Sequence, residues 1–139
     1  QLAIGFAAEL VAMTLFVYFG CGAAASNVHF RENGEWEPAA VTAVALQFGL
    51  GITVLAFATA HTSGGHINCA VTWALTLVGK CHPVRGLVYL VAQLIGSTLG
   101  AALLKATTEG DDEIIGARIL DRSGALGANG RQNPSVTIG

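Results

Sequence analysis

Hydrophobic residues along this chain gather in three long runs separated by short polar segments. The runs cover residues 2–25, 38–60 and 84–104, and only Glu9 interrupts the first. Because about 20 apolar residues in a helix cross a bilayer core, each run predicts a membrane-spanning helix. A fourth apolar stretch, residues 69–79, would rise only about 16 Å as a helix. It therefore predicts a half-helix that enters the membrane and turns back.

The polar segment between the second run and the half-helix is unusual because it has no formal charge. From Pro38 to Gly79 there is no Lys, Arg, Asp or Glu, although residues 61–68 are rich in glycine and polar side chains. Irregular backbone at membrane depth is tolerated only where it lines a water-filled cavity or is buried in protein. Residues 61–79 are therefore interpreted as a pore loop and its half-helix, which favours a channel for a neutral solute.

Composition agrees with an all-α polytopic membrane protein. The 139 residues are 53% hydrophobic and 12% charged, whereas soluble domains have about 25% charged residues. The 18 glycines suit helices that approach one another closely in lipid. A net charge of −2 without a basic patch gives no sign of a nucleic-acid partner. Three cysteines in apolar surroundings are expected to be free thiols.

Charges in the polar segments predict the orientation of the chain in the bilayer. The turn at residues 80–85 carries only basic charges, while the loop at residues 26–37 has one arginine against three glutamates. Basic residues mark the cytoplasmic side of short loops. We therefore expect the turn in the cytoplasm and the loop outside, with residues 107–139 forming a long extracellular loop. Three spans followed by a loop are expected of part of a longer protein.

Several motifs resemble the aquaporin, or major intrinsic protein, family. Residues 63–72 read Ser-Gly-Gly-His-Ile-Asn-Cys-Ala-Val-Thr, which resembles the family's first pore loop, Ser-Gly-x-His-x-Asn-Pro-Ala-Val-Thr, with Cys69 in place of proline. Residues 8–17 are similar to its first-helix pattern, and residues 89–96 to its third-helix pattern Tyr-x-x-Ala-Gln-x-x-Gly. Residues 126–129 resemble the third loop of plant plasma-membrane members.

The resemblance implies the first half of a six-span, inverted-repeat fold in which two half-helices meet at mid-membrane. It implies a passive channel for water, with small neutral solutes as an alternative, that assembles as a homotetramer in the lipid bilayer of the plasma membrane. No enzyme activity and no cofactor are expected.

The start of the half-helix holds the first group of candidate pore residues, Asn68, Cys69 and Ala70. The Asn68 oxygen is expected to cap the helix, which leaves its NH₂ group as a donor to a passing solute. The positive end of the half-helix would then repel cations and protons. Cys69 lacks the preset φ of proline and brings an extra N–H.

The loop before the half-helix supplies the second group, Gly64, Gly65, His66 and Ile67, as a ladder of backbone carbonyls. Glycine permits the φ values that such a ladder needs. A flexible loop is the simpler alternative.

The remaining candidates come from the spans, and the resemblance assigns their roles. Phe48, twenty residues before Asn68, is implied to form one wall of the outer selectivity filter, although a lipid-facing or core phenylalanine is the alternative. Glu9 is implied to brace the first pore loop and Gln93 the second, which this sequence lacks. Generic hydrogen bonding between helices is the alternative for both.

Two other functions remain open from the sequence. One is a structural membrane protein of the same fold with little conductance. The other is an intramembrane metal site made by His61, His66 and Cys69, which lie within nine residues. Zinc sites normally use four ligands, and no fourth lies nearby in the sequence, so no metal is expected.

Overall fold

The computed structural model describes residues 1–27, 31–32 and 35–108. Three long helices and one short helix account for most of this part of the chain, as predicted. They are α1 (Leu2–Ser26), α2 (Pro38–Thr59), α3 (Cys69–Leu77) and α4 (Pro83–Thr107). The three long helices are long and apolar enough to cross a membrane. The structure therefore confirms a mainly helical membrane fold with three long apolar helices and one half-length helix.

A small hairpin between α1 and α2 was not predicted. Strand β1 (Arg31–Glu32) pairs antiparallel with β2 (Glu35–Trp36), with Arg31 opposite Trp36 and Glu32 opposite Glu35. Two residues per strand leave the class of the fold unchanged. The expected extracellular loop from residue 107 and the third-loop resemblance at 126–129 fall almost wholly outside the described residues.

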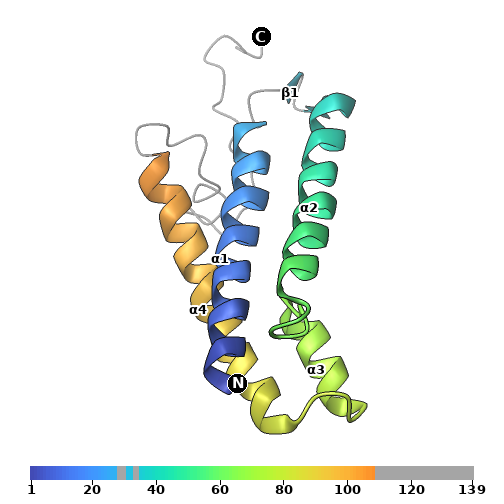
Figure 1. The fold of residues 1–139 in the computed structure, drawn as a ribbon. Coiled ribbons are helices and arrows are strands. Elements are labelled where there is room, and N and C mark those ends of the chain that lie inside the picture. Colours follow the sequence, from blue (N-terminus) through green and yellow to red (C-terminus); the bar gives the residue numbers. More distant parts are fainter. Residues whose placement is uncertain (28–30, 33–34, 109–139) are drawn as a thin grey trace, which may run out of the picture.

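Helix α1 is the centre of the described structure and packs most extensively on α4 (Figure 1). Glycines of α4 make this close approach possible. A Cβ atom at Gly96 would lie 2.6 Å from the Leu10 carbonyl oxygen, and one at Gly100 would lie 2.5 Å from that of Thr14. Small residues let transmembrane helices approach backbone to backbone. The α1–α4 pair is therefore the tightest contact that supports the site.

Helix α2 contacts α1 less extensively and exposes most of its surface. Ala40 is its only buried residue, whereas Phe57 is 85% exposed. Apolar side chains that are uncovered on a membrane-spanning helix face lipid or further protein.

Helix α3 is a half-length element in the position that the sequence predicted. Its nine residues rise about 14 Å, against about 30 Å for a bilayer core. It begins below the end of α2 and runs toward the end of the molecule where α1 starts (Figure 1). Gly79, at φ +73°, ends it, and Pro83 begins α4 at the first helical position. Glycine at the end of a helix and proline at its first position are the residues favoured there.

Candidate functional site

The loop of residues 60–68, which joins α2 to α3, has an irregular backbone with several positive φ angles. Gly64 and Gly65 have φ values of +95° and +63°, and Ile67 has a φ of +43°. A Cβ at Gly65 would lie 2.7 Å from the Ala56 carbonyl oxygen of α2. Glycine is therefore required at Gly65 by both conformation and space. A positive φ is rare for a β-branched residue, so Ile67 must be held by its surroundings.

The Glu9 carboxylate of α1 holds this loop. Glu9 is fully buried and accepts four hydrogen bonds. Its Oε1 atom accepts from the Ser63 hydroxyl at 2.6 Å and from the His66 N–H at 3.0 Å. Its Oε2 atom accepts from the Ile67 N–H at 2.7 Å and from Gln93 Nε2 at 2.8 Å. Two backbone N–H groups of the loop thus find partners that no helix or strand supplies.

Four donors around one carboxylate explain how an acidic side chain can be buried here. Burying a charge without partners is very unfavourable, whereas hydrogen bonds to an ionised group are about twice as strong as neutral ones. The bond to the Ile67 N–H also fixes the residue with the rare φ. Glu9 therefore determines the conformation of the loop from a neighbouring helix.

Gln93 lies on α4 and takes part in the same network. The sequence resemblance implied that it braces a second loop, which this chain lacks. In the structure its Nε2 atom donates to Glu9 and, at 3.0 Å, to the hydroxyl of Thr72. Gln93 is fully buried. Through these two hydrogen bonds its amide connects α4 to both α1 and α3.

Ser63 and Thr72 were not among the residues expected at the site. Both are buried, and Thr72 is completely inaccessible to solvent. Their hydroxyls lie in a charge-free stretch, and a buried polar group needs a partner. Both are also the end residues of the pore-loop motif at 63–72, but neither sign identifies which partner they use.

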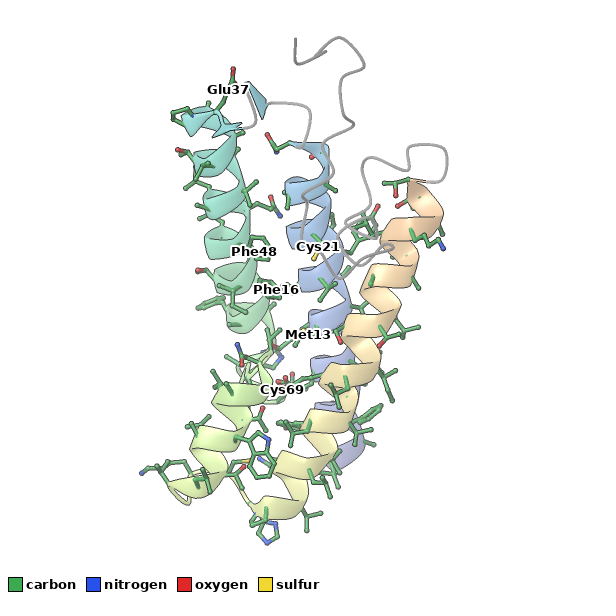
Figure 2. The ribbon with its side chains drawn as sticks, turned by 180° about the vertical axis from the view of Figure 1, so that it is seen from behind. Met13, Phe16, Cys21, Glu37, Phe48 and Cys69 are labelled. Carbon is green, nitrogen blue, oxygen red and sulfur yellow. The ribbon has the colours of Figure 1, made fainter. Side chains whose placement is uncertain are left out.

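Asn68 caps α3 as predicted. Its backbone is extended, and its Oδ1 atom accepts from the N–H groups of Ala70 at 2.7 Å and Val71 at 3.4 Å. Asn68 is exposed, and its Nδ2 atom makes no hydrogen bond within the described part of the chain. Cys69 is the first helical residue, half-buried, at the upper end of α3 in the middle of the molecule (Figure 2). The positive end of α3 therefore lies at mid-height of the molecule, with the Asn68 side chain exposed beside it (Figure 2).

His66 is held on two sides. Its Nδ1 atom lies 3.1 Å from the Thr72 hydroxyl, and its ring meets Tyr89 edge to face with centroids 5.2 Å apart. His61 is exposed. Within residues 1–27, 31–32 and 35–108, no three His, Cys, Asp or Glu side chains come close enough to hold a metal ion. The described structure thus gives no support to a metal site at His61, His66 and Cys69.

Phe48 of α2 points toward α1, at a level above Cys69 (Figure 2). Its ring contacts Phe16 edge to face with centroids 5.6 Å apart, and a Cβ at Gly20 would meet the edge of the same ring at 2.5 Å. Phe48 is only half-buried. The α1–α2 contact therefore includes an aromatic pair, and part of the Phe48 side chain remains uncovered.

Comparison with known proteins agrees with this geometry. Residues 3–139 match the family described as Major intrinsic protein. Aquaporin TIP2-2 of Zea mays is 38% identical over 105 residues, which cover 76% of this chain and 42% of that protein. Probable aquaporin TIP2-1 of Oryza sativa subsp. japonica is 37% identical over the same shares. Probable aquaporin TIP-type RB7-5A of Nicotiana tabacum is 37% identical over 133 residues, 96% of this chain and 51% of the relative.

The chain thus spans about half, or less, of the length of these relatives. Their names carry the TIP designation, and they give no support to the plasma-membrane location implied by the loop resemblance, which is therefore not carried forward. Three apolar spans, a half-helix capped by asparagine and a family match over residues 3–139 lead to one conclusion. The chain belongs to the major intrinsic protein family.

Proposed function

We propose that this chain forms one side of a passive transmembrane channel for water, and for small neutral solutes where the rest of the pore admits them. The observation that carries the proposal is the state of Asn68. Its oxygen is used in capping a half-helix, while its exposed amide nitrogen makes no bond within the described residues. A donor of this kind, beside a helix that carries no formal charge, suits a neutral oxygen-bearing solute.

Ion and proton exclusion follows from the same end of α3. The N terminus of a helix carries about half a positive elementary charge, and α3 places that end at mid-height of the molecule beside the exposed Asn68 (Figure 2). A cation or hydronium ion meets an unfavourable field there, whereas water can turn its oxygen toward the Asn68 donor. On this proposal Cys69 and Ala70 line the pore next to Asn68.

The loop and the aromatic pair complete the proposed wall. The carbonyl groups of Gly64, Gly65, His66 and Ile67 would offer acceptors in sequence, and Glu9 with Gln93 keeps them in place. Phe48 would narrow the pore on the outer side, with Phe16 packed behind it. The two rings pack edge to face with centroids 5.6 Å apart, which suits a constriction supported from behind.

The wider context is part of the proposal. The names of the relatives, all aquaporins, support water as a solute and a channel over an enzyme. The complete protein would add the second half of the pore and assemble as a homotetramer in the bilayer. The basic turn at residues 80–85 would lie in the cytoplasm and the loop at 26–37 on the opposite side.

Osmotic swelling of vesicles tests the proposal. Complete protein in proteoliposomes should raise water permeability well above that of empty vesicles without carrying protons. Asn68→Ala should weaken the helix cap by about 1 kcal/mol and allow proton leak. Asn68→Asp is the matched variant, because aspartate caps a helix equally well but brings a negative charge. It should fold normally and admit cations.

Two results would contradict the proposal. Complete, folded protein that leaves permeability at the level of empty vesicles would favour the structural, non-conducting alternative. If Asn68→Asp vesicles are as impermeable to cations as wild-type vesicles, Asn68 does not line the permeation path.

A further inference from the structure

The hydroxyl of Thr72 sits at a meeting point of three elements. It lies 3.0 Å from the Asn68 carbonyl oxygen, 3.0 Å from Gln93 Nε2 and 3.1 Å from His66 Nδ1. Thr72 is completely buried, so no solvent competes for these positions. A hydroxyl has one proton and two lone pairs. Gln93 Oε1, which can only accept, lies farther off at 3.4 Å. The three nearer partners therefore use the whole capacity of the hydroxyl, and the role of each can be worked out.

Gln93 occupies one lone pair. Its Nε2 atom lies 2.8 Å from Glu9 Oε2, which as a carboxylate oxygen only accepts hydrogen bonds. This contact fixes the orientation of the amide, because the reverse orientation would bring two oxygens together. The nitrogen that faces Thr72 is therefore a donor, and the Thr72 oxygen accepts from it.

The Thr72 proton goes to the Asn68 carbonyl, four residues earlier in the chain. A carbonyl oxygen can only accept a hydrogen bond, and at 3.0 Å it would repel a lone pair of the hydroxyl, so the hydroxyl proton must point toward it. Other helical threonines in the described residues make the same bond at 2.7–3.0 Å, namely Thr14, Thr42, Thr53, Thr59, Thr76, Thr98 and Thr107. The second lone pair of Thr72 then remains for His66.

We infer that Thr72 is a positioning residue that holds His66 as the tautomer with its proton on Nδ1, so that Nε2 is an open acceptor beside the 60–68 loop. A lone pair of Thr72 faces Nδ1, so Nδ1 must donate. The neutral ring then has no proton on Nε2. The edge-to-face contact with Tyr89 holds the ring in this orientation.

Space next to Nε2 is kept by Gly64. A Cβ at Gly64 would lie 3.4 Å from both Nε2 and Cδ2 of His66. Gly64 also has a φ of +95°, which side chains rarely adopt. No side chain of this residue therefore covers the acceptor. A role of Nε2 in permeation rests on the proposed function. Nε2 would receive a hydrogen bond from a permeating molecule that carries an O–H or N–H group, in the same loop as the Asn68 donor.

Nitrogen NMR of the complete protein in proteoliposomes tests the tautomer directly. Histidine labelled with ¹⁵N is observed at a pH where the ring is neutral, and the His66 signals are assigned by their loss in His66→Gln. Wild type should show protonated Nδ1 and unprotonated Nε2. Thr72→Ser should keep this pattern because it keeps the hydroxyl, whereas Thr72→Val should lower the tautomer ratio by about fivefold, the effect of one hydrogen bond.

The control is Thr53→Val, which removes an exposed hydroxyl with the same bond to a carbonyl four residues earlier. It should leave the His66 signals unchanged. Protonated Nε2 in wild type, or a ratio unaffected by Thr72→Val, would overturn the inference even if the protein conducts water. The predicted tautomers in a protein that does not conduct would sustain the inference and refute only the proposed function.

Water flux tests whether the acceptor matters for permeation. Thr72→Val should lower osmotic permeability at equal protein density, whereas the separate variant Thr72→Ser should keep the wild-type permeability. Wild-type water flux in Thr72→Val, together with a shifted tautomer ratio, would show that the Nε2 acceptor plays no part in permeation.

Discussion

Single residues of α1, α3 and α4 decide the shape of a loop that has no regular structure of its own. Glu9 contributes most, because its two oxygens accept hydrogen bonds from two loop N–H groups, the Ser63 hydroxyl and the Gln93 amide. Each oxygen receives two donors, so neither can be exchanged for a donor without leaving groups unpaired.

Glu9→Gln should therefore destabilise the protein strongly although it changes the volume little. The new NH₂ group would face two donors whichever way it turned, and each unpaired buried group costs about 1–3 kcal/mol. A clear fall in the thermal midpoint of the helical circular dichroism signal in detergent is expected. Thr98→Val, which removes an exposed hydroxyl of α4, should leave the midpoint almost unchanged. A Glu9→Gln protein that melts like wild type would contradict this account.

Substitution of Cys69 by proline shows how well the first helical position of α3 tolerates a fixed backbone φ angle. Its N–H makes no hydrogen bond within the described part of the chain, so proline there loses no bond. Cys69→Pro should raise the free energy of unfolding by about 0.4–1 kcal/mol through a less flexible unfolded chain. Ala70→Pro is the matched control, because the Ala70 N–H donates to Asn68 at 2.7 Å and proline would remove that cap. Equal effects of the two variants would be inconsistent with Cys69 as the first helical residue.

Sequence and structure agree to different degrees on these residues, for physical reasons. The cap at Asn68 is a local pattern, and local patterns can be read from spacing. The role of Glu9 came only from family resemblance, since its partners lie 54 to 84 residues away. Thr72 was missed because its hydroxyl is shared among three partners, one of them on another helix. Which lone pair meets which donor depends on distances that a single sequence does not contain.

Among the elements, the helices were predicted, but the pairing of α1 with α4 was not. Hydrophobic runs gave the helices, and the glycine content favoured close helix contacts, one of which the structure places at Gly96 and Gly100 of α4. Which helix packs there is a tertiary property, and the structure shows that it is the backbone of α1 at Leu10 and Thr14. The hairpin of β1 and β2 was not foreseen because two paired residues per strand give no alternating pattern to detect.

Gly96→Ala should weaken this helix pair. The added methyl would lie 2.6 Å from the Leu10 oxygen, so the two backbones must separate, and overpacking of this kind costs about 1–3 kcal/mol. Gly49→Ala in α2 is the control, because a Cβ there meets nothing within 4 Å. It should be neutral or stabilising by up to about 1 kcal/mol, the difference in helix propensity. Thermal midpoints that fall equally in both variants would argue against a close α1–α4 contact.

For the molecule as a whole, the distribution of buried surface is uneven. Polar contacts concentrate where α1, α3, α4 and the 60–68 loop meet, while α2 keeps one buried residue. The loop and the exposed Asn68 amide have protein on the side of Glu9, whereas the described residues supply no wall on the other side of the proposed pore. The relatives are about twice as long as the part that aligns with this chain, or longer.

Residues 1–139 reconstituted alone should therefore give no water permeability above that of empty vesicles. A pore with one wall would leave the loop backbone and Asn68 in contact with lipid, where each unsatisfied polar group costs several kcal/mol. The fragment would instead have to close over the loop or associate. Stopped-flow light scattering compares vesicles with the fragment, with the complete protein and with no protein, at equal lipid content. Flux from the fragment at a sizeable share of the complete protein's would mean that these helices assemble a water path without the missing wall, and the one-sided pore proposed here would be wrong.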